Sequence, residues 1–405
     1  MKSPTRPYIP LAWSNLSGQS AEQLSLAAAP IVAVLLLGAG PGEIGFLAAV
    51  QSLPYLLLSI PAGLLADRVS RRRLMAGAEC LRALALIALV AALLLDRLSI
   101  GLLAALGFVA AVGTIAFMVA APALLPALVP REELARANGR LELARSAAYA
   151  GGPALAGALV SWAGASSAFV LASILSAAAL ALLLRLPETP RKPVAPRHPL
   201  LELQDGARMV WGHQLLRPML LTGIAWNISW FVLQAAYVPY AVRSLGLSAS
   251  EVGLTLGAYG LGMVVGALLA RRLVGAISFG HAILFGPFMS VLAAAVMAAT
   301  LLWPSGWLAT LSFFLFGFGP IIWSITSTTL RQTVTPGAML GRAGAIFLTI
   351  NTGVRPLGAA LGGWVGATWG EAACLLLVVA IYMVQAAMIF FSPVRSLKDL
   401  PASTN

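Results

Sequence analysis

The chain has 405 residues, of which 60% are hydrophobic and only 10% are charged. A water-soluble protein of this length cannot bury so much apolar surface, so the composition excludes a soluble globular fold and indicates lipid as the main solvent. The formal net charge of +12 at pH 7 is divided among short loops, which argues against a nucleic-acid-binding protein.

Apolar segments long enough to cross a bilayer as α-helices recur along the whole chain, since a span needs about 20 residues. They are too long and too evenly apolar for the strands of a membrane barrel. The pattern predicts twelve spans, the first of them retained and not cleaved as a signal peptide. Their predicted bounds are 11–37, 44–65, 74–95, 100–128, 141–162, 166–186, 215–242, 250–269, 281–303, 307–330, 343–367 and 372–391.

The first span carries a polar face. Asn15, Glu22 and Ser25 recur there at helical spacing, and Gln19 and Gln23 widen the face. A charge in the hydrocarbon layer is costly, so this face is expected to look into a protein-lined or wet cavity, with Asn15 and Gln19 near substrate. Loss of bulk water disfavours the charged carboxylate, so Glu22 is predicted to load and release a proton near neutral pH and to couple transport to protons. The alternative is a structural acid hydrogen-bonded to neighbouring helices.

A short basic loop, G-L-L-A-D-R-V-S-R-R-R-L, joins the second and third spans. Its glycine lets neighbouring backbones approach closely, and its acid can make charge-assisted contacts at the membrane boundary. The arginines stay in the headgroup zone, where they meet anionic lipid and hold the loop in the cytoplasm. We predict a cytoplasmic gate formed by Gly63, Asp67, Arg68, Arg71 and Arg72.

Four more charged residues lie shortly after basic loops, on the third and fifth spans. They are Glu79, Arg82, Glu142 and Arg145. We assign them to the first turns of their helices and predict ion pairs at the cytoplasmic surface. In the middle of the fifth span, Gly152 and Pro153 interrupt the helical pattern. Because proline removes a backbone hydrogen bond and glycine permits close packing, this pair predicts a bend.

Residues 187–214 form a proline-rich linker, since repeated prolines forbid a helix and favour a stiff connector. Its last part, 200–216, has apolar residues at helical spacing, which predicts an amphipathic helix on the cytoplasmic face anchored by Trp211. His213 is expected to be solvated, because no second metal ligand accompanies it. The chain is thus divided into an N-terminal bundle, 1–186, the linker, 187–214, and a C-terminal bundle, 215–405.

The seventh span carries Trp226, Trp230 and Gln234 at helical spacing, with Asn227 beside them. Aromatic rings with a few hydrogen-bonding groups suit a largely apolar, aromatic substrate. The alternative for each ring is a place in an interfacial belt. Further candidates for substrate contact are Gln51, Tyr55 and Trp323.

Arg355 lies midway along the eleventh span, after Asn351 and beside Pro356, which loosens the helix. A buried arginine stays charged and needs an anionic or carbonyl partner. Arg355 and Asn351 are predicted to bind an acidic substrate, and Arg355 is a candidate partner for Glu22 when substrate is absent. The alternative is a salt bridge or carbonyl contact that locks two helices.

Basic residues gather in alternate loops, so the positive-inside rule predicts that both termini lie in the cytoplasm. The halves also repeat weakly, because a proline, a Gly-Arg pair and a later proline recur at 130–153 and at 336–356. Such a repeat is typical of units related by a pseudo-twofold axis along the membrane normal. The predicted fold class is an all-α membrane protein with twelve transmembrane helices in two pseudo-symmetric six-helix bundles.

The basic loop resembles the loop-2/3 signature of the major facilitator superfamily, G-x-L-A-D-R-x-G-R-R-x-L, with Ser70 in place of the usual second glycine. Three further motifs are similar to the branch that contains enterobactin-exporter-like siderophore exporters and multidrug exporters. They are L-P-A-L-V-P-R-E-E-L-A-R-A-N-G-R at 125–140, the following G-G-P-A-L-A-G, and W-G-H-Q-L-L-R at the end of the linker helix. Ala21 and Glu22 stand where that branch usually has Gly-Asp, and 107–128 lacks the arginine common in drug-proton antiporters.

The resemblance implies a proton-coupled exporter of a small amphipathic or aromatic compound in a bacterial inner membrane, working by alternating access of two halves. The alternatives are a lysophospholipid or other lipid transporter, with Arg355 at the headgroup, and a non-transporting membrane sensor. The sequence contains neither H-E-x-x-H nor G-x-S-x-G, so no enzyme activity is expected. We expect a monomer that binds a small-molecule substrate and protons, without a cofactor or a metal.

Overall fold

The computed structural model describes residues 8–128, 134–187, 199–336 and 339–401, and these fold into helices joined by short turns. The first half of the chain contains α1 (Tyr8–Leu37), α2 (Pro41–Arg68), α3 (Arg71–Leu94), α4 (Ile100–Leu128), α5 (Leu134–Ala163) and α6 (Ser167–Leu184). The second half contains α7 (Pro199–Gly212), α8 (Leu216–Arg243), α9 (Ala249–Ala276), α10 (Phe279–Ala299), α11 (Gly306–Val334), α12 (Leu340–Gly353), α13 (Arg355–Phe390) and the short 3-10 helix η3 (Pro393–Ser396).

The predicted spans coincide with these helices, and the fold class of an all-α membrane protein with twelve transmembrane helices is confirmed. In the described part of the chain, eight helical stretches are long and apolar enough to cross a membrane. The last of them, Leu340–Phe390, has 51 residues and contains the final two predicted spans. Gly370 separates these spans, because its φ of 82° lies in the left-handed region that glycine adopts without strain.

The chain divides by its contacts into two compact units. Unit 1 consists of Met1–Ala39, Phe46–Val194 and Gly246–Gly257, and unit 2 consists of Gly40–Gly45, Ala195–Leu245 and Ala258–Asn405. The predicted division into an N-terminal bundle, 1–186, a linker, 187–214, and a C-terminal bundle, 215–405, stays a prediction.

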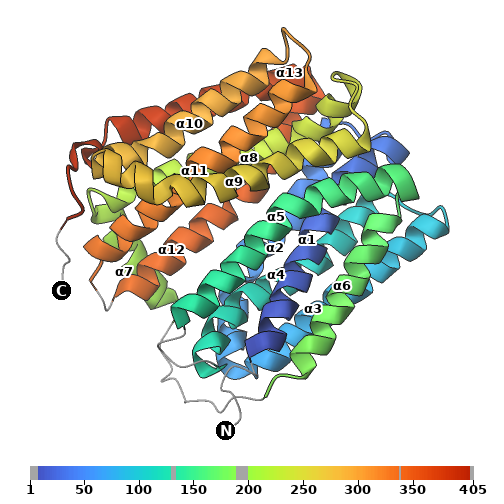
Figure 1. The fold of residues 1–405 in the computed structure, drawn as a ribbon, viewed down its shortest axis with the longest axis horizontal. Helices are drawn as coiled ribbons and strands as arrows, with labels where there is room; N and C mark the ends of the chain where they lie inside the picture. The colour runs from blue at the N-terminus through green and yellow to red at the C-terminus, as the bar shows by residue number, and fades with distance from the viewer. Residues whose placement is uncertain (1–7, 129–133, 188–198, 337–338, 402–405) are drawn as a thin grey trace. The chain divides into compact units, whose positions relative to one another are not determined.

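In unit 1, α1 packs against α5 and α6, and α3 packs against α4 and α6 (Figure 1). Only Val69 and Ser70 separate α2 from α3, so the helices extend into the segment predicted as a loop. The Ser70 hydroxyl caps α3 by accepting a hydrogen bond from the backbone N–H of Arg73 at 3.4 Å. Arg72 Nη1 donates to the Leu186 carbonyl at 2.8 Å, which ties the start of α3 to the chain just after α6.

In unit 2, α8 packs against α13, α10 against α11 and α12 against α7. The structure contains a helix, α7, in the last part of the predicted linker, and its place on the cytoplasmic face stays a prediction. Val210 of α7 is fully buried in the apolar core of the unit, whereas Trp211 is 53% exposed. Asp205 forms an ion pair with Arg342 at 3.5 Å, and a Cβ on Gly206 would lie only 3.0 Å from the Arg342 carbonyl oxygen. These contacts fix α7 against the start of α12.

Candidate functional site

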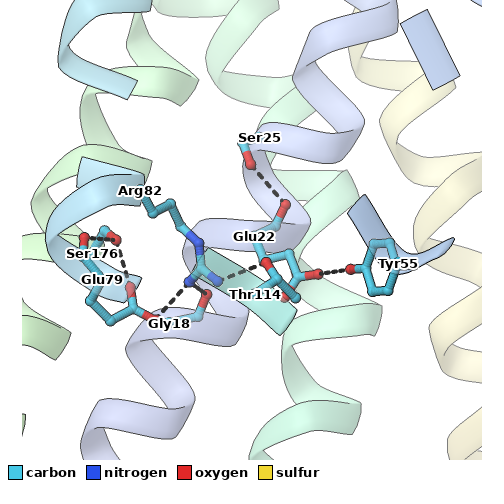
Figure 2. Close-up of polar contacts among 8 residues, drawn as sticks. All are labelled: Gly18, Glu22, Ser25, Tyr55, Glu79, Arg82, Thr114 and Ser176. Carbon is cyan, nitrogen blue, oxygen red and sulfur yellow. Dashed lines mark hydrogen bonds and ion pairs between the residues drawn. The ribbon is translucent and has the colours of Figure 1, made fainter. Parts of the chain in front are cut away.

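Glu22 lies half-buried in the second half of the polar face of α1. The Tyr55 hydroxyl of α2 donates to Glu22 Oε1 at 3.4 Å, and the Ser25 hydroxyl donates to the Glu22 backbone carbonyl at 3.0 Å (Figure 2). The structure therefore brings together Glu22 and Tyr55, which were predicted separately as a proton site and a substrate contact. Their roles stay predictions.

The other polar residues of this region have contacts within unit 1. Asn15 is 9% exposed, and its Nδ2 donates to the Leu141 carbonyl of α5 at 3.2 Å. Gln51, one turn from Tyr55 on α2, lies against Gly107 of α4, where a larger residue would collide with its side chain. Gln19 is half-buried on α1. The hydrogen bond to Leu141 gives the buried Asn15 amide a partner, and the predicted substrate contacts of Asn15, Gln19 and Gln51 stay predictions.

A buried ion pair lies deeper in unit 1 and joins Glu79 and Arg82 of α3. Arg82 Nη1 lies 2.8 Å from Glu79 Oε1, and the two residues are 2% and 0% exposed respectively. The predicted ion pairing is confirmed for Glu79 and Arg82, but the predicted location of this pair at the surface was wrong, because both residues are buried. Since α3 begins at Arg71, Glu79 lies eight residues further on, about 12 Å along the axis at 1.5 Å per residue. Spacing from the basic loop alone did not reveal this depth.

The pair contacts three further residues (Figure 2). Arg82 Nη1 donates to the Gly18 carbonyl of α1 at 3.2 Å, and Arg82 Nη2 donates to Thr114 Oγ1 of α4 at 2.8 Å. The Ser176 hydroxyl of α6 donates to Glu79 Oε2 at 2.6 Å. We call Gly18, Glu79, Arg82, Thr114 and Ser176 the Arg82 network. The i,i+3 spacing of an acid and an arginine was the available sequence signal, because it places both on one helix face.

The predicted gate is only partly described. The backbones of Gly63, Asp67 and Arg68 belong to α2, but the side chains of Asp67 and Arg68 lie outside the described residues. Arg71 is the first residue of α3, and Arg72 contacts the carbonyl after α6. The gate role of all five stays a prediction.

The two remaining predictions for the fifth span concern α5. Gly152 and Pro153 lie buried inside this helix, which continues through them, and the bend stays a prediction. A Cβ on Gly152 would lie 2.5 Å from Gln23 Cβ, so the glycine allows α1 to approach α5. Arg145 lies over the Tyr149 ring at 5.6 Å from its centroid, and the Glu142 side chain lies outside the described residues.

Unit 2 contains a polar cluster where α12 ends and α13 begins. Arg355 Nε donates to Asn227 Oδ1 at 3.1 Å, and Asn227 Nδ2 donates to the Gly223 carbonyl at 2.9 Å. The Arg355 guanidinium lies 5.7 Å from the centroid of the Phe231 ring. A Cβ on Gly223 would lie 2.5 Å from Asn351 Oδ1, so the Asn351 side chain packs against that glycine. We call Gly223, Asn227, Phe231, Asn351 and Arg355 the Arg355 cluster.

Two features distinguish the Arg355 cluster. Asn351 Oδ1 is buried and accepts no hydrogen bond from the described residues. Pro356 occupies the first turn of α13, where its missing N–H costs nothing, and Val354 is the single residue between α12 and α13. The cluster therefore lies at an interruption of a spanning helix, a place where membrane proteins expose polar backbone to a cavity or ligand.

Trp226 and Trp230, the two tryptophans predicted at helical spacing in the seventh span, both lie on α8 but in different surroundings. Trp230 is only 9% exposed and packs against Tyr259, Phe313 and Phe316, with ring centroids between 4.8 and 6.0 Å apart. Trp230 is thus a core residue of unit 2. Trp226 stacks on Trp230 at 5.4 Å.

The indole nitrogens of Trp226 and Trp323 are buried and meet no acceptor in the part of the chain that the structure describes. Gln234, one turn beyond Trp230, is half-buried. Unpartnered buried donors are uncommon in proteins, so Trp226 and Trp323 fit a ligand-contacting role better than Trp230 does.

His213, expected to be solvated, lies at the start of α8 and is partly buried. Its Nδ1 accepts hydrogen bonds from the backbone N–H groups of Leu215 at 3.1 Å and Leu216 at 3.4 Å. Burial lowers the pKa of His213 below its ordinary value of 6.5. Among the described residues, no group of three His, Cys, Asp or Glu side chains is placed to hold a metal ion.

Comparison with known proteins identifies relatives of the chain. The enterobactin exporter EntS of Citrobacter koseri is 31% identical over 311 residues, which cover 75% of this chain and 72% of the relative. The enterobactin exporter EntS of Salmonella typhi is 31% identical over 313 residues, with the same coverage.

Solved structures share the fold at low sequence identity. A POT family transporter in complex with 5-aminolevulinic acid superposes with a TM-score of 0.78, at 14% identity and 96% coverage of both chains. A bacterial homologue of the iron transporter ferroportin in an inward-facing state gives a TM-score of 0.74, at 18% identity, covering 95% of this chain and 100% of the other. The family model of the Major Facilitator Superfamily matches residues 11–359, and the chain therefore belongs to this superfamily of membrane transporters.

Proposed function

We propose that the protein is a proton-coupled exporter of small amphipathic or aromatic compounds in a bacterial inner membrane, with both termini in the cytoplasm. Membership of a transporter superfamily supports transport of a small molecule. The curated relatives are enterobactin exporters, which supports outward transport and a siderophore-like cargo. The alternation of basic and base-poor loops supports the orientation.

The observation that carries proton coupling is the contact between Glu22 and Tyr55. An acid inside a spanning helix is a functional candidate by default, because a membrane disfavours its charge. Ionised Glu22 can only accept a hydrogen bond, so the Tyr55 hydroxyl donates to it at 3.4 Å. Protonated Glu22 gains a donor of its own. Loading a proton therefore changes the bond between α1 and α2, which is the kind of local event that biases a conformational equilibrium.

The Arg355 cluster and Trp226 support an aromatic cargo with polar oxygens. The guanidinium of Arg355 suits anionic or carbonyl oxygens. Asn351 Oδ1 accepts no hydrogen bond and Trp226 Nε1 donates none to the described residues, so a cargo with hydroxyl and carbonyl groups would satisfy both. The half-buried ring of Trp226, which stacks on the core residue Trp230, suits an aromatic ligand. Further substrate contacts are assigned to Gln19, Gln51, Gln234 and Trp323.

Transport by purified protein in proteoliposomes tests the proposal. An imposed pH gradient should drive movement of enterobactin, with ethidium as a second probe, and a trapped pH-sensitive dye should report coupled proton flux. Glu22→Gln should abolish gradient-driven transport because the amide cannot carry an exchangeable proton. Glu43→Gln is the matched control, since Glu43 is exposed near the start of α2 and Gln can still accept the hydrogen bond from the Gly40 N–H.

Undiminished gradient-driven transport by Glu22→Gln would refute the proton-coupling role. Transport of a labelled lysophospholipid, with neither enterobactin nor ethidium moved, would favour the lipid-transporter reading over the exporter of aromatic compounds. Absence of movement for all three probes, in protein that inserts and unfolds cooperatively, would favour the sensor.

A further inference from the structure

The Arg82 network is unusual because one guanidinium connects three helices inside the membrane-spanning part of unit 1. Its terminal nitrogens bond to Glu79 on α3, to the Gly18 carbonyl on α1 and to Thr114 on α4. The second oxygen of Glu79 accepts from Ser176 on α6. Four helices therefore meet at one ion pair, which is almost completely buried.

An ion pair in such a place needs an explanation beyond packing. Burying two charges is costly, and well-packed apolar residues often replace a buried pair without loss of stability. The distinctive property of this pair is that its arginine also bonds to the backbone of another helix. Arg82 extends from α3 across to the backbone of α1 instead of pairing only with Glu79 (Figure 2).

The α1 atom that Arg82 contacts belongs to the turn that ends at Glu22. In an α-helix, the carbonyl of residue 18 accepts the backbone N–H of residue 22. A carbonyl oxygen has two lone pairs, so it can accept from both the Glu22 N–H and Arg82 Nη1. Arg82 therefore donates to the Gly18 carbonyl oxygen, the same atom that accepts the helical hydrogen bond from the Glu22 N–H.

Two glycines allow the close helix approach that the hydrogen bonds of Arg82 require. A Cβ on Gly18 would lie 2.8 Å from Glu79 Oε1, so any larger residue there would push the carboxylate away from α1. A Cβ on Gly113 would lie 2.6 Å from the Ala78 carbonyl oxygen, so this glycine lets α4 approach α3 closely enough for Thr114 to reach Arg82. Both glycines lie where the network needs short distances.

We propose that Arg82, held by Glu79, is a positioning residue that fixes the Gly18–Glu22 turn of α1 and so sets the environment in which Glu22 gains and loses its proton. This inference rests on the proposed role of Glu22 as the proton site. The helices that contact α1 carry other charged or titratable side chains that the structure describes. They are Glu43 and Tyr55 on α2, Arg71, Arg72, Arg73 and Cys80 on α3, and Arg145 and Tyr149 on α5, whereas α4 and α6 contain none.

The test measures protonation of Glu22 without any transport substrate. Dicyclohexylcarbodiimide modifies protonated carboxyls within membranes, so the pH dependence of Glu22 modification in full-length protein, followed by mass spectrometry, gives a midpoint. Two variants perturb the network. Gly18→Ala displaces Glu79 while keeping both charges, and the double variant Glu79→Leu/Arg82→Met removes both charges at similar volume.

Each variant should shift the Glu22 midpoint by about half a pH unit or more, because the carboxyl no longer has a fixed environment. Gly77→Ala is the matched control, since a Cβ on this exposed α3 glycine meets nothing within 4 Å, and its midpoint should equal that of the wild type. Unchanged midpoints in folded Gly18→Ala and double-variant protein would overturn the proposal.

If neither variant folds, Thr114→Val decides the question, because it removes only the α4 acceptor of Arg82 and keeps the side-chain volume. A shifted midpoint would support the positioning role, and a wild-type midpoint would overturn it.

The outcome of this labelling test can be distinguished from the outcome of the transport test of the proposed function. Normal gradient-driven transport by Glu22→Gln refutes coupling whatever the labelling gives, whereas unshifted labelling with inactive Glu22→Gln refutes positioning alone.

Discussion

The Arg82 network of unit 1 and the Arg355 cluster of unit 2 each place an arginine inside a bundle of membrane-spanning helices, but the hydrogen-bonding partners of the two arginines differ. Arg82 has an ionised partner at 2.8 Å and two further acceptors, and both oxygens of Glu79 are bonded. Arg355 meets a neutral amide, Asn227, at 3.1 Å, beside an amide oxygen of Asn351 that accepts no bond from the described residues.

This difference separates buried polar groups that bond to one another and stabilise the fold from buried polar groups that can still bond to a ligand. A buried network whose charged members bond to one another is stable as it stands, and removing one member leaves another in a low-dielectric environment without compensation. An unsaturated cluster retains hydrogen-bonding capacity that water or a bound molecule must satisfy. Changes in the Arg82 network should therefore act first on stability, and changes near the Arg355 cluster first on binding.

The largest expected effect is on stability in unit 1. Arg82→Met leaves the Glu79 carboxylate buried without its ion-pair partner, which should cost about 3–5 kcal/mol of unfolding free energy. The double variant with Glu79→Leu should recover most of that loss, because no buried charge remains. Unfolding of purified protein in mixed detergent micelles measures both. A double variant as unstable as the single one would contradict the view that the uncompensated charge dominates.

Alanine substitution at two comparable glycines sharpens the contrast. Gly18→Ala forces Glu79 Oε1 to move while Arg82 holds it, and overpacking of this kind should cost about 1–3 kcal/mol. Gly223→Ala presses on the side-chain amide of Asn351, whose oxygen accepts no hydrogen bond from the described residues, so the cost should stay below about 1 kcal/mol. Melting temperatures of the two variants in the same detergent give the comparison. Equal destabilisation would remove the distinction.

Trp226→Phe should act on binding. The substitution removes a buried N–H that meets no described acceptor, so stability should change little beyond the reduced stacking on Trp230. If the cargo accepts a hydrogen bond there, enterobactin affinity should fall up to about tenfold, the value of one such bond. Ligand-induced thermal stabilisation measures this effect. Trp307→Phe is the control, since Trp307 is 84% exposed, and its affinity should match the wild type.

The smallest effect is expected at the entry to α8, the helix that carries Asn227. His213 Nδ1 accepts two backbone N–H groups only when unprotonated, and burial lowers the pKa of His213 in the folded state. As the pH falls through 6.5, the unfolded chain therefore binds more protons than the folded chain does. The stabilising contribution of His213 should be fully present above pH 6.5 and should decline as the pH falls towards the lower pKa of the folded state. Loss of this cap-like contact should cost about 0.5–1 kcal/mol.

Melting temperatures between pH 5 and pH 8 measure the His213 contribution. His213→Gln should flatten that part of the profile, because its amide oxygen can accept the same N–H groups and does not titrate. An identical pH profile in wild type and His213→Gln would assign the titration to another group.

The spans were predictable because each is a long apolar run, and membrane crossing requires such runs. Their ends were less so. The basic segment after Asp67 was predicted as a loop, but α2 continues through Arg68 and α3 begins at Arg71, since Ser70 provides a helix cap between them. Glu22 was identifiable as a lone acid within a span, and its spacing to Ser25 along α1 follows from helical periodicity. Its contact with Tyr55, 33 residues away, was not predictable from spacing.

Helical membrane spans follow from the amino-acid pattern alone, because the hydrophobicity of each segment makes lipid its solvent and the backbone must then satisfy its own hydrogen bonds as a helix. The pattern also placed Glu22 and Arg355 inside spans, but it did not reveal the buried positions of Glu79 and Arg82. Packing in three dimensions was needed to show which of these charges have a partner. The partners of Arg82 come from α1, α3 and α4, and the close approach that joins them depends on glycines on different helices, a property of packing that no local pattern encodes.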